Sequence, residues 1–586
     1  MKNYIKMTCI LGVLLASVNT KAQDQFTNCG NVMIHNGATV SFYGNLINNK
    51  TFVDSGSGIT MAGTSAQQIG GTAFAIFKNL TLKNAAGAYL GVNEYLSGVL
   101  TVTSGTFTTT GYDLTLLSTA NGTASIAPIL GNFAGNITMQ RYISKGATSW
   151  RFLASPVTGA TIGSWQKDFT TSGFHGSTNP GYPFVSIYTY NESVPGPDVN
   201  GYVAATDSSN PLTPGVGFWC YVGPVPLTFS VTGPPVKFSH TFSVSYTPSA
   251  GTSQDGWVMI GNPYPSAIDW SSAAWTKTNI NNAVYIWNDA LQQYASWVSG
   301  VSVNGGSSII PSSQSFWIQT NGANPALVSN ENVKVSSNPT FMQPNSNQTF
   351  DVLRFNLTGN GYKDEAIVRF GVGATNEYDA SLDARKIYSS NTQVPGIASQ
   401  DSTLKDLSIN SMPAVTSSID VPIKTIVGVS GIYTINLDSS SIVPTGYCLV
   451  LEDKVTGLQM DISNFTTYTF NISDTTTAAR FVLHIGQCTT PTGINQLAEN
   501  PYQISAYPNP TNGLVNVSYN LNSEECLGAT LQVVDMSSGK IVADKSISCK
   551  TNIEQVDLSG YSNGVYSINI VSPSNTSSHV KVIKMR

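Results

Sequence analysis

The sequence predicts an all-β protein made of several domains. Val, Ile, Thr, Tyr and Phe recur in short alternating runs broken by Gly, Asn, Ser and Pro, which is the pattern of strands and turns. The 586 residues include only 28 Lys and Arg and 33 Asp and Glu, too few for coiled coils or long solvated helices. In chain order we expect a β-helix-like solenoid segment, duplicated β-rich modules, a β-sandwich and a small immunoglobulin-like β-sandwich.

Residues 1–22 have the pattern of a secretory signal peptide. Lys2 and Lys6 precede an apolar run over residues 7–18, and Ala22 ends the segment with a small side chain. The run is shorter than the roughly 20 residues of a membrane-spanning helix. We therefore expect cleavage after Ala22 and export of a mature chain without a transmembrane segment. The net charge of −5 gives no basic surface for nucleic acid.

Residues 23–145 are expected to form a β-solenoid-like stalk segment. The strand-like runs are short and Thr-rich, and they lack clean two-residue hairpin turns. Asn recurs at the turns, where it tolerates left-handed conformations and can form ladders between stacked coils. A β-helix is therefore favoured, and a β-sandwich of equal length is the alternative. The recurring residues are Asn45, Asn48, Asn49, Asn79 and Asn84.

Residues 146–325 contain an internal repeat. Each unit carries a Trp with a Pro in the same local pattern, then a Tyr-x-aromatic-Asn strand, then a Pro followed by Phe-Trp. This order predicts two similar β-rich modules or two halves of one pseudo-symmetric domain. The paired segments are WRFLASP from Trp150 with WVMIGNP from Trp257, SIYTYNE from Ser186 with AVYIWND from Ala283, and LTPGVGFWCYV from Leu212 with IIPSSQSFWIQT from Ile309.

The aromatic side chains of this region have two interpretations. Those at matched repeat positions are expected to fill cores, although they could also serve as stacking platforms for sugar rings. The matched set is Trp150, Tyr188, Tyr190, Trp219, Trp257, Tyr285, Trp287 and Trp317. Aromatic residues outside the repeat pattern are expected to be exposed and are the first candidates for glycan contacts. These candidates are Tyr264, Trp270, Trp275 and Trp297.

Residues 346–487 follow a polar linker and read as a β-sandwich, because strand-like runs recur about every ten to twenty residues. An acidic cluster in this segment offers the hard oxygen ligands that Ca²⁺ prefers. Its spacing fits no calcium-binding loop, so a solvated acidic face is favoured and no metal site is predicted. The cluster contains Asp364, Glu365, Glu377, Asp379 and Asp383.

The C-terminal segment, residues 504–586, follows a linker at 488–503 and carries an ordered series of turn and strand residues. The series is Tyr507, Pro508, Asn509, Pro510, Gly513, Asp535, Gly539, Lys540, Gly564, Tyr566, Lys581 and Lys584. This tail resembles the type A C-terminal sorting domain of the type IX secretion system of Bacteroidetes. The resemblance implies Sec export, recognition by the type IX translocon and sorting machinery, and then release or attachment to surface lipopolysaccharide.

Other segments are similar to parts of exported Bacteroidetes proteins. The stalk runs into GNITMQRYI at Gly135–Ile143, as do the repetitive stalks of their surface proteins. The repeat resembles a module common in such proteins, and the sandwich resembles a unit often placed before the sorting tail. These resemblances imply no catalytic residue.

Within the tail, the residues themselves predict a small seven-stranded sandwich. The prolines cannot donate to a strand ladder, and the glycines mark turns. Lys581 and Lys584 are expected to be exposed and to protect an edge strand. If Leu531–Asp535 pairs with Lys540–Asp544, Cys526 and Cys549 come close enough for a disulfide, unless a bulge shifts the register.

Catalytic constellations are weak. The five histidines fall in different predicted regions, and no nucleophile elbow, P-loop or dinucleotide-binding motif is present. We therefore expect no enzyme, no cofactor and no metal. A pair of carboxylates in a cleft would be enough for glycoside hydrolysis, so sequence leaves that alternative open. Its main candidates in the aromatic region are Asp255, Asp269 and Asp289.

The stalk, the repeated modules and the sorting tail together predict a secreted or surface-displayed, adhesin-like structural or binding protein. The alternative is a carbohydrate-binding accessory protein that captures polysaccharide, with a glycoside-active enzyme less favoured. The ligand is not specified by any motif.

Overall fold

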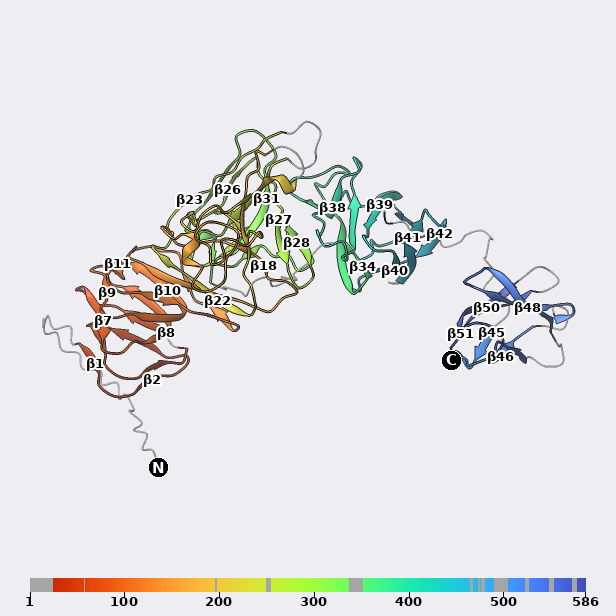
Figure 1. Ribbon diagram of the computed structural model, residues 1–586, viewed down its shortest axis with the longest axis horizontal. Helices are drawn as coiled ribbons and strands as arrows, with labels where there is room; N and C mark the ends of the chain where they lie inside the picture. The colour runs from red at the N-terminus through yellow and green to blue at the C-terminus, as the bar shows by residue number, and fades with distance from the viewer. Residues whose placement is uncertain are drawn as a thin grey trace, which may run out of the picture. The chain divides into compact units, whose positions relative to one another are not determined.

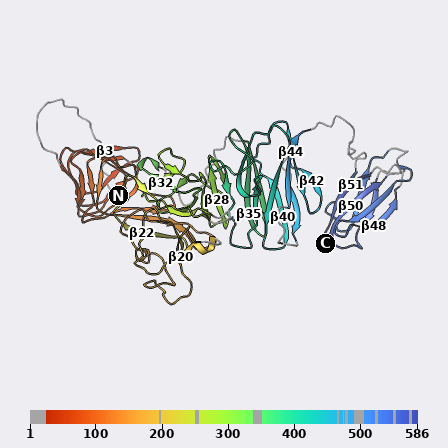
Figure 2. The same ribbon diagram turned by 90° about the horizontal axis from the view of Figure 1, so that it is seen from above.

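The computed structural model describes residues 25–56, 58–194, 198–248, 255–336, 351–463, 467–472, 475, 480–488, 504–521, 526–547, 553–571 and 577–585. The predicted signal peptide and most of the 488–503 linker lie outside them. The chain divides into two compact units, Met1–Gln487 and Cys488–Arg586. Both consist of β-sheets (Figures 1 and 2), which confirms the all-β prediction. The helices described over their full length are 3-10 turns: η1 (Ile162–Ser164), η2 (Asp198–Gly201) and η3 (Glu331–Val333).

The first part of the chain is a parallel β-solenoid, coloured red to orange in Figure 1. Its strands are β1 (Phe26–Asn28), β2 (Val32–Ile34), β3 (Thr39–Phe42), β4 (Leu46–Asn48), β5 (Phe52–Asp54), β6 (Gly58–Met61), β7 (Gln67–Gly71), β8 (Ile76–Lys83), β9 (Ala88–Leu90), β10 (Glu94–Ser104), β11 (Thr106–Thr108), β12 (Leu114–Leu116), β13 (Ser118–Thr119), β14 (Gly122–Thr123), β15 (Ser125–Ile126), β16 (Asn132–Ala134) and β17 (Ile137–Ile143).

Successive coils of the solenoid pair in parallel. One sheet runs β1-β4-β7-β9-β11-β16, and the other contains β2-β5-β8-β10-β12-β17. Leu46 lies between Phe26 of one coil and Ile69 of the next. Parallel strands cannot be joined by tight hairpins, so strands that are neighbours in a sheet belong to successive coils. The β-helix prediction is therefore confirmed, and the alternative sandwich is wrong for this segment.

Buried asparagines connect the coils. Nδ2 of Asn28 donates to Oδ1 of Asn48 over 2.7 Å. Nδ2 of Asn48 donates in turn to the carbonyl oxygens of Ala73 and Phe74, at 3.2 and 3.0 Å. Asn48 is only 1% exposed, so these bonds replace the water that its amide would otherwise need. The expected asparagine ladder is present between these coils.

The repeated module follows the solenoid, in yellow and green in Figure 1. Its strands are β18 (Trp150–Leu153), β19 (Ile187–Tyr190), β20 (Tyr202–Ala204), β21 (Phe218–Tyr221), β22 (Leu227–Gly233), β23 (His240–Thr241), β24 (Trp257–Gly261), β25 (Ala267–Asp269), β26 (Thr276–Thr278), β27 (Val284–Asn288), β28 (Gln293–Val298), β29 (Val301–Val303), β30 (Ile309–Ile310), β31 (Ser315–Gln319), β32 (Ala326–Ser329) and β33 (Lys334–Val335).

The two repeats fold into sheets of matching order. The first sheet runs β18-β21-β19-β20 and the second β24-β31-β27-β28-β29. In both, the strand with the leading Trp pairs antiparallel with the Phe-Trp strand. The Phe-Trp strand then pairs with the Tyr-x-aromatic-Asn strand. The three sequence landmarks thus occupy matching strands in the two sheets.

The repeats join through a reciprocal pair of β-bridges. Leu153, in the first repeat, pairs with Gln314, which lies just before the Phe-Trp strand of the second. Ile260, the counterpart of Leu153, pairs with Val216, the counterpart of Gln314. Such an exchange, in which each partner makes the same contact with the other, is the mark of a two-fold relation. Of the two predicted alternatives, the structure has two halves of one pseudo-symmetric domain.

Equivalent carboxylates reinforce this pseudo-symmetry. Asp289 of the second repeat accepts a hydrogen bond from the N–H of Thr148, at 3.1 Å, and pairs with Arg151 at 3.0 Å, both near the start of the first repeat. Glu192, which occupies the same place in the first repeat, accepts from the N–H of Gly256, at 3.2 Å, at the start of the second. Each repeat therefore holds the first strand of the other.

The solenoid and the first repeat share one apolar core. β22 pairs antiparallel with β17 along seven residues, from Ile137 opposite Gly233 to Ile143 opposite Leu227. The shared core then continues to Trp165 and neighbouring residues of the first repeat. The second repeat has a core of its own. The apolar core is therefore continuous across residue 145, where the sequence predicted a boundary between domains.

The next segment is a β-sandwich. Its strands are β34 (Asp351–Gly359), β35 (Tyr362–Phe370), β36 (Ala384–Arg385), β37 (Gly396–Gln400), β38 (Asp406–Met412), β39 (Ile419–Ile426), β40 (Gly431–Leu437), β41 (Tyr447–Asp453), β42 (Leu458–Asp461), β43 (Thr467–Ile472) and β44 (Phe481–Gln487). They form one sheet in the order β42-β41-β44-β39-β37-β38-β35-β34-β40-β43, with β36 beside β38. Phe355 and Leu437 from one half of this sheet share a core with Leu449 and Phe481 from the other. The sheet therefore folds over on itself.

The acidic cluster of the sandwich is not a solvated face. Asp364 and Asp383 are fully buried. Oδ1 of Asp383 accepts from the N–H of Ser411, at 2.6 Å, and Oδ2 from the N–H of Asp379, at 2.7 Å. Burial raises the pKa of Asp383 to about 6, although these bonds act to lower it. The prediction is wrong for Asp364 and Asp383, because their carboxylates satisfy groups inside the fold. Glu377 is exposed.

The second unit is a sandwich of two sheets, β45-β46-β49 and β48-β47-β50-β51. Its strands are β45 (Ile504–Tyr507), β46 (Leu514–Tyr519), β47 (Thr530–Asp535), β48 (Lys540–Ser546), β49 (Ile553–Asp557), β50 (Gly564–Val571) and β51 (Ser577–Lys584). The seven-stranded prediction is confirmed. β47 and β48 pair with a bulge between Val533 and Val534, which sets Leu531 opposite Lys545. Cys526 is disulfide-bonded. Cys549 lies outside the described residues, so their pairing stays a prediction.

We predict that Asn48→Ala destabilises the solenoid by about 1–3 kcal/mol, because it leaves buried polar groups without partners. Urea unfolding of the mature chain measures the change. Asn121→Ala, at an exposed turn of the same solenoid, is the matched control and should stay within about 0.5 kcal/mol of wild type. Equal effects of the two changes would contradict a special role for the ladder.

We also predict an acid-sensitive sandwich. Burial acts to raise the pKa of Asp453, but bonds from Arg480, Tyr468 and the N–H of Val455 outweigh it and lower the pKa to about 2. The folded state therefore binds this proton less readily than the unfolded state does. About 2 kcal/mol of stability, present above pH 4, should be lost as the pH falls from about 4 to 2.

Hydrogen exchange of β41 and β44, corrected for the intrinsic pH dependence of exchange, measures this loss. Asp453→Asn should remove most of the dependence in that window. Asp461→Asn, an exposed neighbour, should keep it. An unchanged pH profile in Asp453→Asn would contradict the assignment.

Candidate functional site

A cleft of about 540 Å³ lies between the repeated module and the sandwich. One wall comes from the repeats and is aromatic, and the other comes from the sandwich and is basic. The repeat wall consists of Tyr190, Tyr202, Trp257, Tyr294 and Trp317. The sandwich wall consists of Arg385, Lys386, Ile387, Tyr388, Leu404, Lys405, Asp406 and Lys424.

The aromatic wall is held by ring contacts among its own members. The ring of Tyr190 meets that of Trp317 edge-to-face, with centroids 4.6 Å apart. Tyr202 packs against Tyr190 at 5.4 Å, and Trp257 packs against Trp317 at 6.3 Å. Trp257 and Trp317 are largely buried, whereas Tyr190 and Tyr202 are half-buried. Tyrosine rings fixed in this way present both apolar surface and a polar hydroxyl.

Asp406 organises the polar part of the cleft. Its Oδ2 pairs with Nζ of Lys424 at 2.7 Å and accepts from the hydroxyl of Tyr388 at 3.0 Å. Its Oδ1 accepts from Nε2 of Gln400 at 2.9 Å. Burial, and next the Asp406 charge, raise the pKa of Tyr388 well above its usual range, so the hydroxyl stays a donor. Both carboxylate oxygens of Asp406 are therefore engaged.

The loop at the edge of the cleft is constrained. Oδ1 of Asp401 accepts from the N–H of Thr403 at 2.8 Å and from that of Lys405 at 2.9 Å. Between them, Leu404 has a φ of 63° and is 66% exposed. An exposed leucine in the left-handed region is uncommon, and such strain tends to collect at ligand sites.

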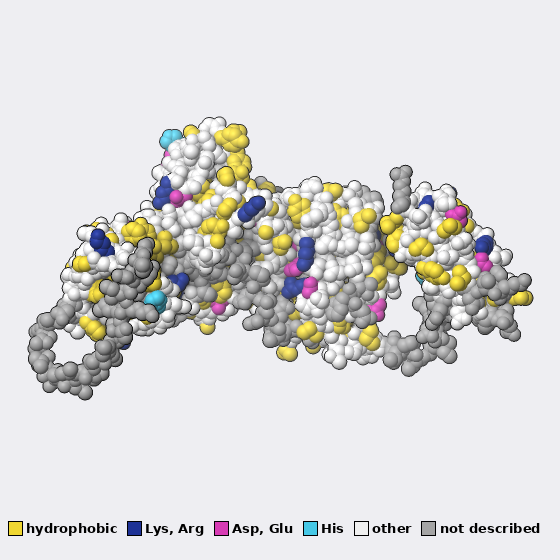
Figure 3. All heavy atoms as spheres, turned by 90° about the horizontal axis from the view of Figure 1, so that it is seen from below, with side chains coloured by type: hydrophobic (Ala, Val, Ile, Leu, Met, Phe, Trp, Pro, Cys, Tyr) yellow, Lys and Arg dark blue, Asp and Glu magenta, His cyan; other side chains and the backbone are white. Residues whose placement is uncertain are grey.

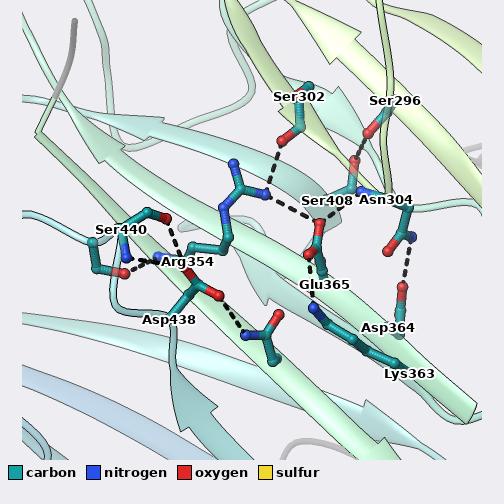
Figure 4. Close-up of polar contacts among 12 residues, drawn as sticks. Ser296, Ser302, Asn304, Arg354, Lys363, Asp364, Glu365, Ser408, Asp438 and Ser440 are labelled. Carbon is teal, nitrogen blue, oxygen red and sulfur yellow. Dashed lines mark hydrogen bonds and ion pairs between the residues drawn. The ribbon is translucent and has the colours of Figure 1, made fainter. Parts of the chain in front are cut away.

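A polar network holds the two walls together (Figure 4). From the repeats, Nδ2 of Asn304 donates to Oδ1 of Asp364, at 2.8 Å, and its N–H donates to Glu365, at 2.8 Å. From the sandwich, Arg354 bonds both to the carbonyl of Ser302 and to Glu365. Sequence reasoning placed Asp364 and Glu365 on the surface, but they join the walls of the cleft.

The four aromatic candidates that sequence reasoning proposed for glycan contacts are not exposed. Tyr264 and Trp270 are fully buried, and Trp275 and Trp297 are 8% and 7% exposed. Their polar atoms point inward, as Nε1 of Trp270 donates to the carbonyl of Asn282. The expectation of exposed rings is wrong, because these residues form the separate core of the second repeat.

The repeat-matched aromatics divide between core and surface. Trp257, Tyr285 and Trp317 are buried, as the core interpretation expects. The other five are half-buried: Trp150, Tyr188, Tyr190, Trp219 and Trp287. Tyr190, Trp257 and Trp317 line the cleft, so repeat matching found part of the aromatic wall.

The first repeat presents an open aromatic face. Trp150 stacks on Trp219 with centroids 5.0 Å apart, and Phe184 and Tyr221 pack against Trp150 edge-on. Phe184 and Tyr221 are each 37% exposed. In the second repeat, the equivalent tryptophans share an apolar cluster with residues of the sandwich, among them Ile409. Trp219 also packs against this cluster, so the exposed part of the first repeat's face is the side of Phe184 and Tyr221.

Sequence reasoning missed the basic wall. Charged residues are one in ten of this chain, and few charges appear on the face drawn in Figure 3. Against that background the adjacent Arg385 and Lys386 were the available signal, but they match no motif. Among the described residues, no group of three acidic, histidine or cysteine side chains could hold a metal ion. The described part of the chain also has no helix long and apolar enough to cross a membrane.

The sorting residues cluster where the chain enters the second unit. Nδ2 of Asn509 donates to the carbonyl of Lys581 at 2.7 Å, and Oδ1 accepts from the N–H of Ile583 at 2.9 Å. The proline-rich entry is thereby tied to β51, which is an edge strand. Lys581 is exposed as expected. Lys584 is not, being 7% exposed with Nζ donating to the carbonyl of Ser559. The prediction that Lys584 is exposed is wrong, because its ammonium group donates to backbone carbonyls.

The remaining sorting residues form turns and core. Asp535 accepts from the N–H and hydroxyl of Ser537, and these bonds lower its pKa. Gly539, with a φ of 67°, completes the same turn. Tyr566 is buried, and its hydroxyl donates to the carbonyl of Ser562 at 2.6 Å. Of the others, Tyr507, Pro508, Pro510 and Lys540 are exposed, Gly513 directly precedes β46, and Gly564 begins β50.

The structure is that of a multidomain β-protein with a separate C-terminal unit, and comparison with known families identifies its parts. The chain belongs to the family described as "Domain of unknown function (DUF8693)", which matches residues 54–485. The secretion system C-terminal sorting domain matches residues 505–585. The protein is thus a cargo of the type IX secretion system, exported to the cell surface or the medium, and its tail engages that machinery.

No curated protein matches the chain in sequence. Among solved structures, it is similar to an immunoglobulin-like β-sandwich protein of the DUF3244 family from Bacteroides vulgatus ATCC 8482, at 12% identity over 14% of this chain and 94% of that one, with a TM-score of 0.12. A two-domain fibronectin type III segment of chicken tenascin matches at 13% identity over 27% and 94%, with a TM-score of 0.12. A polysaccharide lyase matches at 9% identity over 40% of each chain, with a TM-score of 0.12.

We predict that Asn509→Ala loosens the entry to the sorting domain, because both of its bonds to β51 disappear. The cost should be about 1 kcal/mol, since the bonds are exposed. Hydrogen exchange of the 577–585 peptide in the full chain should quicken. Asn516→Ala, which removes only a long 3.5 Å bond from Gln555 among the described residues, is the control and should leave that peptide unchanged. Unaltered exchange in Asn509→Ala would contradict the proposal that Asn509 ties the domain entry to β51.

Proposed function

We propose that the protein is an adhesin-like binding protein that works outside the cell, and that the cleft between the repeats and the sandwich binds carbohydrate. The aromatic wall carries this proposal. Binding sites for small ligands are concave, rich in aromatic side chains and supplied with a few fixed polar groups. The cleft has this composition and a volume that suits a short oligosaccharide segment.

The rigidity of the cleft supports a binding role. Nδ2 of Asn304 and the buried Ser296–Ser408 hydroxyl pair connect the walls, and the N–H of Arg385 donates to the hydroxyl of Tyr285 over 2.7 Å. A site with walls fixed in advance loses little conformational freedom when a ligand enters. Such preorganisation suits a protein that captures a polymer.

A binding role is proposed in preference to glycoside hydrolysis. Asp406 is the one carboxylate among the described residues of the cleft lining, and Lys424 neutralises it. A glycosidase needs a second carboxyl group across the bond that it cleaves. Of the acidic residues that sequence reasoning considered, Asp289 is buried against Arg151. Neither Asp255 nor Asp269 lines the cleft.

The solenoid and the sorting domain suggest how the site is displayed. We propose that the solenoid acts as a stalk segment beside the binding module. After the translocon has acted on the tail, the mature chain is either attached to surface lipopolysaccharide or released. Both fates leave the cleft outside the cell.

Affinity electrophoresis of the mature chain in gels that contain single polysaccharides, charged and neutral, tests the proposal. We predict retention in at least one gel and a loss of about tenfold in affinity for Tyr202→Ala, because an aromatic ring of the cleft wall disappears. Tyr112→Ala, an exposed tyrosine of the solenoid, is the control and should be retained like wild type.

Two results would overturn this proposal. Failure of the folded wild type to be retained in any gel would remove the binding function. Loss of retention in Tyr221→Ala, with Tyr202→Ala unaffected, would move the site from the cleft to the open aromatic face.

A further inference from the structure

We propose that the cleft selects an anionic saccharide, one that carries carboxylate or sulfate groups, and that Arg385 and Lys405 select it. This inference rests on the proposed carbohydrate-binding function and names its ligand class. Neutral sugars need only the aromatic wall, so the basic wall requires a separate explanation.

The cleft is strongly basic for this protein. Its lining holds Arg385, Lys386, Lys405 and Lys424 against the single carboxylate of Asp406. The chain as a whole has 28 basic and 33 acidic residues. Four cations in one concave site therefore run against the composition, and within a partly enclosed aromatic cavity their field is screened less than at an open surface.

Two of these cations are already neutralised by the fold. Nζ of Lys386 lies 2.5 Å from Oδ2 of Asp364, and both side chains are buried. Nζ of Lys424 lies 2.7 Å from Oδ2 of Asp406. These two pairs are structural, so they leave Arg385 and Lys405 as the cations that a ligand can address.

Arg385 and Lys405 have no such partners. No described carboxylate forms an ion pair with either of them. Both lie over the ring of Tyr378, with the guanidinium carbon at 4.6 Å and the ammonium at 5.8 Å from its centroid. The side chain of Arg385 also bonds that of Tyr378, which acts to lower the pKa of Tyr378. Tyr378 therefore holds the guanidinium in the cleft wall without neutralising its charge.

The geometry also reduces repulsion toward an anion. The oxygens of Asp406 are occupied by Lys424, Tyr388 and Gln400, so its charge is compensated. The N–H of Lys405 is fixed by Asp401, which positions the residue at the edge of the cleft. A guanidinium and an ammonium that line one cleft suit the oxygens of a carboxylate or a sulfate, and Arg can bind such a group through two N–H donors.

The test measures binding of the mature chain to matched oligosaccharides by calorimetry. Oligogalacturonate and its neutral methyl ester form the carboxylate arm, and dextran sulfate and neutral dextran form the sulfate arm. We expect at least one charged member to bind more tightly than its neutral partner. Its affinity should fall as NaCl rises from about 0.05 to 0.5 M, because salt screens the attraction.

Lys405→Gln should weaken the charged ligand by about tenfold more than its neutral partner, which matches the loss of one charge-assisted contact. Arg385→Gln should do the same. Lys405→Gln decides the matter if Arg385→Gln fails to fold, because Lys405 forms no ion pair with the residues that the structure describes. Lys78→Gln, an exposed lysine of the solenoid with the same change of charge, is the control and should bind like wild type.

The outcomes separate the two proposals. Equal binding of charged and neutral partners would overturn anion selection and leave the carbohydrate-binding function standing. An equal loss in Lys78→Gln and Lys405→Gln would also overturn it, because attraction to the whole surface would then explain the binding. Binding of no charged or neutral saccharide by the folded wild type would overturn both.

Discussion

The cleft depends on the hydrogen bonds and the ion pair that the buried carboxylate of Asp364 makes. A fully buried charge must be paired and hydrogen-bonded, since an isolated one would be strongly destabilising. Asp364 meets this requirement by bonding Asn304 of the repeats, Lys386 of the cleft and the N–H of Ile397 in β37. One group therefore fixes the sandwich against the repeats and anchors a cation of the basic wall. The walls of the cleft have a defined separation because this carboxylate cannot be left unsatisfied.

The cleft arises from the duplicated repeats and from the packing of the sandwich on one of their faces. The repeats exchange equivalent bridges and equivalent carboxylate contacts, so they form one pseudo-symmetric unit. Symmetry alone would give two similar aromatic faces. The sandwich packs on the face of Trp257 and Trp317, whereas Phe184 and Tyr221, which pack on Trp150, stay exposed. Both repeats contribute to the cleft wall, but of the two matched Phe-Trp strands only the second places its tryptophan, Trp317, in the lining.

Polar side chains replace charge throughout this protein. Asn48 connects solenoid coils, Asn304 connects modules, and Asn509 ties the sorting entry to the last strand. An amide both donates and accepts, so it can satisfy backbone groups without the desolvation cost of an ion. A chain with few charges can still specify junctions between β-units in this way. Some of the charges that it does keep neutralise one another in buried pairs, such as Lys386 with Asp364 and Arg480 with Asp453.

The sequence by itself determined the β-class, the solenoid, the repeat and the sorting tail, because strand alternation, turn residues and repeated landmarks are local patterns. It could not determine which aromatics face solvent. Tyr264 and Trp270 were expected outside and lie in a core, while Tyr202 was not singled out and lines the cleft. Nor could the sequence predict that Arg385 and Lys405 line the same cleft as Tyr190. Exposure and proximity depend on which surfaces other units cover, and only the tertiary packing of the sandwich on the second repeat decided that.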